Sequence, residues 1–283
     1  MDHYCVLGNP VEHSQSPLIQ SRFAELTGQP LRYTKQWVAL DGFTEMLARL
    51  RTDGVRGCNV TVPFKFEAFQ VAHHATDRAQ LAQAANTLYF DDGGIHADNT
   101  DGVGLVNDIQ HNAGIRLADR TILLVGAGGA AAGVLGPLLA SGARRIVVVN
   151  RSPEKASALV ERHRQHPWVQ GLLQKTELLA LEIHGLTGVF DVVINATASS
   201  LNGAAIPVPS RILRPGTLAY DMMYGPAAEP FTQWASSHGA IARDGLGMLV
   251  EQAAAAFATW RGIAPPSGQV LREMRAAMSP AAA

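Results

Sequence analysis

The sequence predicts an α/β protein with two domains, and three observations support this fold class. Apolar, β-branched runs alternate with helical stretches along the chain, which is typical of a mainly parallel sheet covered by helices. One such run, residues 122–125, leads directly into a glycine-rich turn and an Ala-rich helical stretch. The chain has 283 residues, 47% hydrophobic and 17% charged, which is enough for two buried cores.

The N-terminal third contains the strands and helices expected of one α/β domain. We expect helices at residues 16–27 and 43–50, and strands at residues 3–7, 31–38, 55–60, 87–90 and 95–97. Ser16 is the expected N-cap of its helix, because Pro17 suits the first helical position. The sequence Asp-Asp-Gly-Gly at 91–94 predicts a hairpin turn between the last two strands.

A helix expected from Asp101 leads into the second domain. The strands expected there are residues 122–125, 146–149, 192–194, 218–220 and 240–242. Pro-rich residues 206–209 are expected to form a surface loop, and an apolar helix at 248–260 is expected to end at Gly262.

The glycine-rich turn predicts a phosphate-binding site. Gly126 allows a tight turn, Gly128 lets bare backbone approach a pyrophosphate, and the small Ala131 lets the helix pack close to its strand. The helix N-terminus adds N–H groups and a partial positive charge. The motif therefore predicts a Rossmann-type domain whose cofactor-binding residues include Gly126, Ala127, Gly128, Gly129 and Ala130.

The residues after the second strand of this domain select the dinucleotide. An NAD-binding domain places a carboxylate there for the ribose 2′-hydroxyl. This strand instead ends in Asn150, Arg151 and Ser152, with Lys155 one turn further on. Arg151 and Lys155 could be solvated charges, but cations are mildly unfavourable at a helix N-terminus, whereas arginine binds a 2′-phosphate well. The sequence therefore predicts NADP(H) rather than NAD(H).

Composition argues against several other kinds of partner. A formal net charge of −1 gives no basic field for nucleic acid or an anionic membrane. No apolar stretch is long enough to span a membrane and no signal peptide is apparent, so we expect a cytoplasmic protein. Cys5 and Cys58 are each expected in a strand, buried and reduced.

The histidines do not predict a metal site. His73, His74, His163 and His166 lack a carboxylate or cysteine partner set with metal-ligand spacing, so we expect surface histidines and no metal. The sequence leaves a monomer and a homodimer open, because it shows neither an exposed heptad nor an interface strip.

Three polar clusters lie at strand or loop ends in the first domain. They are His-Ser-Gln-Ser-Pro at 13–17, Asn-Val-Thr-Val-Pro-Phe-Lys at 59–65 and Asp-Asn-Thr-Asp-Gly at 98–102. Together with residues 220–224 and 245–252, they resemble the motifs of the shikimate dehydrogenase family, in the same order, from about Val6 to Trp260. The resemblance implies reversible, NADPH-dependent reduction of 3-dehydroshikimate to shikimate, on the route to chorismate and the aromatic amino acids.

The resemblance also implies the division of the chain. A discontinuous substrate-binding domain would comprise residues 1–101 and 245–283, and an NADP-binding Rossmann domain residues 102–244. An active-site cleft would lie between the two domains, and their closure would exclude water from the hydride path.

Single residues receive roles from the same resemblance. Lys65 and Asp101 are the expected catalytic pair, because the ammonium of Lys65 can protonate a developing alkoxide that Asp101 helps to orient. The substrate carboxylate is expected to bind Ser14, Ser16 and Tyr224, and the ring hydroxyls Thr61, Asn86 and Gln252. Three further cofactor contacts are expected at Thr197, Met222 and Gly245.

Seven of these residues also have a purely structural explanation. Ser14 and Asn86 could be turn residues, and Ser16 and Asp101 could be helix caps. Lys65 could be an exposed residue at the start of a helix. Met222 could fill the core, and Gln252 could face solvent. Their joint occurrence in the family's order favours the functional explanation. Ala198 and Ser200 depart from the family's Asn-Ala-Thr-Ser-x-Gly run, which affects the expected geometry of the cofactor loop.

Two other functions are alternatives. An NAD-dependent quinate/shikimate dehydrogenase is disfavoured by Ser14 beside the carboxylate site and by Arg151 with Lys155. A non-catalytic NADP-binding regulator on the same scaffold is disfavoured by the intact Lys65 and Asp101, since binding alone does not require both.

Overall fold

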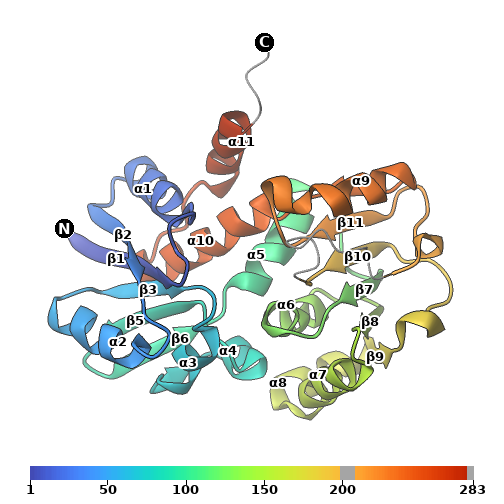
Figure 1. Cartoon of the computed structure of the whole chain (residues 1–283), viewed down its shortest axis with the longest axis horizontal. Helices are drawn as coiled ribbons and strands as arrows, with labels where there is room; N and C mark the ends of the chain where they lie inside the picture. Colours follow the sequence, from blue (N-terminus) through green and yellow to red (C-terminus); the bar gives the residue numbers. More distant parts are fainter. Residues whose placement is uncertain (198–207, 279–283) are drawn as a thin grey trace. The chain divides into compact units, whose positions relative to one another are not determined.

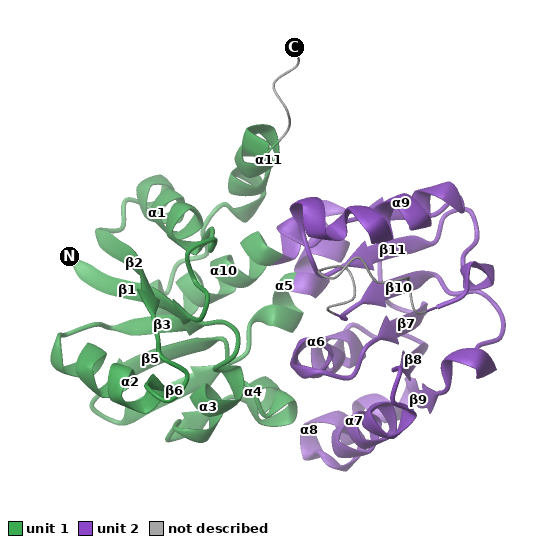
Figure 2. Cartoon of the chain, in the orientation of Figure 1, with its two compact units in different colours: residues 1–104, 249–283 green, residues 105–248 purple. Residues whose placement is uncertain are grey.

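The structure is a computed structural model, and it describes residues 1–197 and 208–278. The chain divides into two compact units, unit 1 (residues 1–104 and 249–283) and unit 2 (residues 105–248) (Figure 2). Each unit has one six-stranded sheet with helices packed on it. This confirms the predicted α/β class with two parallel-rich sheets. The predicted domain limits at 101 and 245 fall a few residues before the limits of the units.

The sheet of unit 1 has the strand order β2-β1-β3-β5-β6-β4 (Figure 1). Its strands are β1 (Asp2–Gly8), β2 (Leu31–Trp37), β3 (Gly57–Val60), β4 (His74–Ala75), β5 (Thr87–Asp91) and β6 (Gly94–Asp98). Only β5 runs antiparallel to its neighbours, because the hairpin at 91–94 reverses the chain. The helices are α1 (Ser16–Thr27), α2 (Phe43–Thr52), α3 (Lys65–Gln70), α4 (Asp77–Ala82), α10 (Leu246–Arg261) and α11 (Ser267–Met278), with α10 beginning in unit 2.

Alternation along β1 gives unit 1 a core on each face of its sheet. Cys5 and Leu7 belong to the cluster that contains Phe43 of α2 and Phe64 before α3, whose rings stack at 5.1 Å. Tyr4 and Val6 face the other way, toward Trp260 of α10, and the Tyr4 and Trp260 rings stack at 4.6 Å. Both cysteines are buried and free, as the sequence predicts.

Parallel pairing brings two of the predicted motifs to one edge of this sheet. Leu7 of β1 pairs in register with Val60 of β3, so both strands end side by side. The amide of Thr61 then donates to the carbonyl of Leu7 at 2.9 Å, and the amide of Asn9 to the carbonyl of Val62 at 3.1 Å. The segments that carry Ser14 and Lys65 therefore leave the sheet together.

The sheet of unit 2 is entirely parallel, in the order β12-β11-β10-β7-β8-β9. Its strands are β7 (Thr121–Val125), β8 (Arg145–Val149), β9 (Glu177–Leu181), β10 (Val192–Asn195), β11 (Leu218–Asp221) and β12 (Ile241–Arg243). The helices are α5 (Asp101–Asn107), which begins in unit 1 and continues as a π-helical turn (Asp108–Asn112), α6 (Gly129–Ala140), α7 (Pro153–Gln165), α8 (Pro167–Gln170) and α9 (Glu229–Ser237). Chain order reverses between β7 and β10, and ligands of open α/β sheets bind at such switch points.

The structure corrects several local predictions. Ser16 is the first residue of α1 and Gln15 is its N-cap, with no side-chain capping hydrogen bond. β9 was not expected, because its Leu- and Ala-rich sequence suits a helix, and pairing with β8 decides its conformation. α11 was not expected either, although buried Val270, Leu271 and Met274 repeat at helical spacing. The expected loop at 206–209 lies partly outside the described residues.

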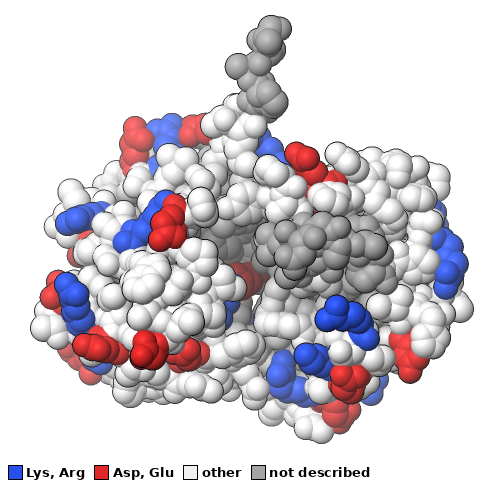
Figure 3. Space-filling model, in the orientation of Figure 1, with Lys and Arg blue, Asp and Glu red and all other residues white. Residues whose placement is uncertain are grey.

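Charged side chains of both signs lie on the surface of unit 1. On the unit 1 face seen in Figure 3, basic and acidic side chains lie beside each other in several places, and a row of acidic side chains follows the lower edge. Within the described ranges, none of the helices combines the length and apolarity that a membrane span requires.

Candidate active site

Lys65 and Asp101, the predicted catalytic pair, meet in unit 1. Lys65 is the first residue of α3, held in place by the fully buried Phe64, and Asp101 is the first residue of α5. Lys65 Nζ donates to Asp101 Oδ2 at 2.6 Å, and the two side chains are 26% and 10% exposed. A hydrogen bond between two charged groups at this distance is among the stronger ones in proteins. The partly exposed ammonium therefore stays accessible while the carboxylate fixes its direction.

Asn86 connects this pair to Gln252 of α10. Its Nδ2 atom donates to Asp101 Oδ1 at 2.8 Å and approaches Gln252 Oε1 at 3.2 Å, and its Oδ1 accepts from the amide of Thr100 at 2.8 Å. Asn86 is 3% and Gln252 8% exposed. The solvent-facing alternative for Gln252 is therefore wrong, whereas Asn86 is buried within the bend that precedes β5.

Ser14, Ser16 and Thr61 lie in the two segments that leave the sheet beside each other. Ser14 Oγ donates to Ser16 Oγ at 3.2 Å and accepts from the Ser16 amide at 3.3 Å. Ser16 is buried and Ser14 half-buried. A Cβ at Gly8 would lie 2.5 Å from Thr61 Cγ2, so glycine is required there for the two segments to approach.

Sequence reasoning missed part of the buried polar network around these residues. Asn59 Nδ2 donates to the carbonyl of Asn86 and to Thr87 Oγ1, both at 3.1 Å, and its Oδ1 accepts from the Tyr33 hydroxyl at 2.7 Å. Burial raises the pKa of Tyr33 well above its ordinary value, so the phenol remains a donor at neutral pH. Asn59 is the first residue of the polar cluster at 59–65, whereas nothing in the sequence around Tyr33 indicates a role in this network.

The glycine-rich turn of unit 2 has the geometry that a diphosphate requires. Gly126 has φ +118°, and a Cβ there would lie 3.0 Å from the carbonyl oxygen of Ala196. At Gly128, no described atom beyond the neighbouring residues of the chain lies within 4 Å of the position of a Cβ. α6 begins at Gly129, and the described residues provide no side-chain cap for it. These residues fit NADP(H), whose pyrophosphate would take the place of a cap.

The segment after β8 agrees with the choice of NADP. Asn150 Nδ2 donates to the carbonyl of Ser152 at 3.0 Å, which tightens the turn before α7. Arg151 is exposed on this turn, and Lys155 is exposed in the first turn of α7. Neither side chain is buried, and the contact of both with a 2′-phosphate remains a prediction.

Three other predicted cofactor residues gather around the end of β10. Asn195, 1% exposed, accepts from Thr197 Oγ1 at 2.7 Å and its carbonyl accepts from the Met222 amide at 3.0 Å. The Gly245 amide donates to the carbonyl of Met223 at 2.8 Å, and a Cβ at Gly245 would overlap the carbonyl of Met222. Thr197, Met222 and Gly245 thus form one cluster. Ala198 and Ser200 lie outside the described residues.

Tyr224 also belongs to unit 2, and its predicted contact with the substrate carboxylate remains a prediction. Its side chain is half-buried, and burial raises the pKa of its phenol. The hydroxyl is therefore protonated at neutral pH and available as a donor.

One histidine prediction is wrong. His163 is fully buried in α7, whereas His73 and His74 are exposed. The helical spacing from His163 to His166 suggests one face, but the packing of α7 turns His163 inward. In the part of the chain that the structure describes, no group of three His, Cys, Asp or Glu residues could hold a metal ion.

A phosphate-binding turn on a parallel sheet, together with a lysine–aspartate pair beside buried amides, defines an oxidoreductase that uses a dinucleotide. Residues 6–88 match the shikimate dehydrogenase substrate binding domain, residues 108–203 the shikimate/quinate 5-dehydrogenase family, and residues 245–278 the shikimate 5′-dehydrogenase C-terminal domain. The chain belongs to the shikimate dehydrogenase family.

Individual relatives support the same assignment. The shikimate dehydrogenase (NADP(+)) of Acidovorax sp. (strain JS42) is 63% identical over 278 residues, which cover 98% of this chain and 97% of the relative. The solved structure of an Ael1 enzyme from Pseudomonas putida is 42% identical, with a TM-score of 0.88 over 96% of this chain and 98% of that one. Shikimate 5-dehydrogenase from Thermus thermophilus, solved with NADP(H) and shikimate, is 28% identical, with a TM-score of 0.83 over 98% of this chain and 100% of that one.

Proposed function

We propose that the protein catalyses the reversible, NADPH-dependent reduction of 3-dehydroshikimate to shikimate, a step toward chorismate and the aromatic amino acids. The observation that carries the proposal is the contact between Lys65 and Asp101 at 2.6 Å beside buried Asn86. Membership of the shikimate dehydrogenase family supplies the substrate class.

Lys65 is the proposed proton donor. When bound, NADPH supplies the hydride that the carbonyl carbon receives, and the carbonyl oxygen then requires a proton. Lys65 Nζ donates it in the reducing direction and accepts it back from the alcohol in the oxidising direction. The positive charge of the ammonium also stabilises the oxygen while negative charge develops on it.

Asp101 orients Lys65 in this proposal. Its Oδ2 accepts from Lys65 Nζ, and its Oδ1 accepts from Asn86 Nδ2 at 2.8 Å, so both oxygens are held from different sides. The carboxylate oxygens retain lone pairs that can accept from a substrate hydroxyl. We assign the other ring hydroxyls to Thr61, Asn86 and Gln252, and the substrate carboxylate to Ser14, Ser16 and Tyr224.

The test is absorbance of the reduced nicotinamide, with shikimate or quinate and NADP or NAD. We expect turnover with shikimate and NADP, lost in Lys65→Ala while shikimate still binds, and reduced in Asp101→Asn. Lys175→Ala, at an exposed lysine of unit 2, is the matched control and should keep wild-type turnover. Preference for quinate or NAD would refute the substrate and cofactor assignment. Binding of NADP without any turnover would instead favour the non-catalytic regulator.

Two properties of the whole molecule complete the proposal. We propose a cytoplasmic location, supported by two buried, free cysteines, and fractionation that finds the protein elsewhere would refute it. We also propose a homodimer, supported by exposed apolar side chains of unit 1 such as Trp37, Leu40 and Phe66. Light scattering should then give twice the chain mass of 30.1 kDa, and a mass of 30.1 kDa would refute the dimer.

A further inference from the structure

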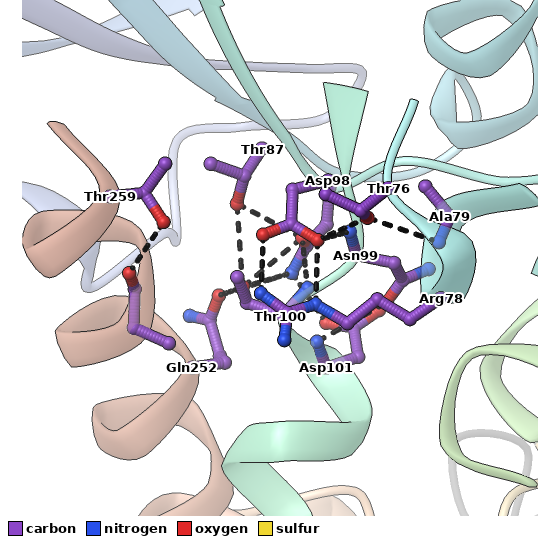
Figure 4. A network of polar contacts seen from close by, with 12 residues as sticks. Thr76, Arg78, Ala79, Thr87, Asp98, Asn99, Thr100, Asp101, Gln252 and Thr259 are labelled. Carbon is purple, nitrogen blue, oxygen red and sulfur yellow. Dashed lines mark hydrogen bonds and ion pairs between the residues drawn. The ribbon is translucent and has the colours of Figure 1, made fainter. Parts of the chain in front are cut away.

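Arg78 forms a bidentate ion pair with Asp98 at the edge of the polar network (Figure 4). Arg78 Nε donates to Asp98 Oδ1 at 2.6 Å, and Nη2 donates to Oδ2 at 2.5 Å. Arg78 comes from α4 and Asp98 is the last residue of β6. The Asp98 side chain is 4% exposed and that of Arg78 31%. The planar guanidinium matches both carboxylate oxygens, which an ammonium cannot do.

Asp98 uses the same carboxylate to hold the start of the segment that leads to Asp101. Its Oδ1 accepts from the Asn99 amide and from Thr76 Oγ1, each at 2.7 Å. Asn99 is fully buried, and its Oδ1 accepts from the Asp101 amide at 3.2 Å. Three contacts in series therefore connect the guanidinium to the backbone of the residue that pairs with Lys65.

The amide group of Asn99 is itself fixed at its other end. Asn99 Nδ2 donates to the carbonyl of Ala84 at 3.0 Å, two residues before Asn86. The amide of Asn86 donates to the carbonyl of Asp98 at 3.1 Å, and the Thr100 amide donates to Asn86 Oδ1. Residues 84 and 86 thus bind the segment 98–101 along its length, and Arg78 binds the carboxylate of Asp98 at the start of the segment.

Charge gives Arg78 a second effect. Asp98 and Asp101 are two carboxylates only three positions apart, and without a cation Asp98 would be a buried, uncompensated charge. The guanidinium compensates Asp98, which leaves Asp101 as the partner of Lys65. Loss of the guanidinium would release Asp98 to move toward water and take the segment with it.

We propose that Arg78 is a positioning residue for the reaction, acting through Asp98 and Asn99 to set the direction of the Asp101 carboxylate. It was not among the residues that the sequence singled out, and it does not contact Lys65 or Asp101 itself in any described interaction. The inference rests on the proposed function, because its readout is the turnover of shikimate with NADP.

The experiment compares Arg78→Lys with the wild type and with Arg49→Lys. Arg49 is an exposed arginine of the same unit, paired with Asp53 at 3.7 Å, and serves as the matched control. Arg78→Lys keeps the positive charge but cannot bind both carboxylate oxygens of Asp98 at once. Asp98 therefore retains a cation, and we expect the variant to fold. We expect kcat for shikimate oxidation to fall about 10- to 100-fold, the range for a small misplacement of a catalytic group, with a smaller factor in KM.

The ratio of the effects on kcat and KM separates positioning from a merely structural role. If Asp101 is held less firmly near Lys65, kcat of the folded Arg78→Lys enzyme should fall more than KM changes, whereas a purely structural role would leave kcat per folded molecule unchanged. The double variant Arg78→Met/Asp98→Asn removes both charges of the ion pair and leaves no unpaired buried charge. It therefore tests the series of contacts from Arg78 through Asp98 and Asn99 to Asp101. It should show the same loss of kcat with thermal unfolding close to that of the wild type.

Either proposal can fail separately. An inactive wild-type chain would overturn the proposed function. An active wild type together with Arg78→Lys and the double variant at wild-type kcat would overturn the role of Arg78. Loss of activity in Arg49→Lys equal to that in Arg78→Lys would also overturn it, since the effect would then not depend on the path through Asp98.

Discussion

His163 should make the stability of the protein fall in mildly acidic solution. It lies in α7 at 0% exposure, and its Nδ1–H donates to the carbonyl of Leu159 at 2.9 Å. Within the described residues, Nε2 has no hydrogen-bond partner. Burial lowers the pKa of His163 from 6.5 to about 4, and the charges of Arg162 and His166 add to the effect, while the backbone of Leu159 and Ala132 opposes it.

The sign and size of the effect follow from proton linkage. Below pH 6.5 the unfolded chain takes up a proton at His163, whereas the folded chain does so only near pH 4. Between these values the unfolded state binds more protons, so the free energy of unfolding decreases as the pH falls. The full difference of about 2.5 pH units corresponds to ~3 kcal/mol, of which about 2 kcal/mol is lost between pH 7 and pH 5.

Urea unfolding at pH 7 and at pH 5 measures this loss. His163→Leu removes the titrating group, so its unfolding free energy should fall by about 2 kcal/mol less than that of the wild type over this interval. His111→Gln is the control, because His111 is exposed and its replacement should leave the wild-type pH dependence unchanged. Equal losses in the wild type and in His163→Leu would refute the assignment to a neutral, buried imidazole.

Three further predictions concern unit 2. Arg151→Gln should raise the KM for NADP about 10- to 100-fold and leave the KM for NAD unchanged, because only NADP loses a charged hydrogen bond to its 2′-phosphate. Steady-state kinetics measure both values, and equal changes in the two KM values would contradict the prediction. Gly247→Ala should lower the free energy of unfolding by about 1–3 kcal/mol, since a Cβ there would overlap the buried Asp108 carboxylate, and an unchanged thermal midpoint would show that the site can relax. Arg243→Met removes the partner at 2.5 Å from fully buried Asp108 and should cost about 3–5 kcal/mol in urea unfolding, with part of the loss recovered when Asp108→Asn is added.

The local elements were predictable because their signals are short-range. The run of apolar residues before Gly126 and the small residues after it specify strand, turn and helix within about ten residues, and the structure has β7 and α6 there. The hairpin at 91–94 is equally local. By contrast, β9 depends on β8 for its conformation, and the exposure of His163 depends on which face of α7 is covered.

The sequence by itself determined the class of fold, the phosphate-binding turn and the family, because strand–turn–helix chemistry and ordered motifs are properties of neighbouring residues. Only the tertiary structure decided that Gln252 is buried against Asn86, 166 positions away, and that Arg78 reaches Asp98. The direction in which a polar side chain points is set by the elements packed around it, and buried donors and acceptors must find partners there. These hydrogen-bond partners come from elements that are distant in the sequence, so no local sequence pattern can identify them.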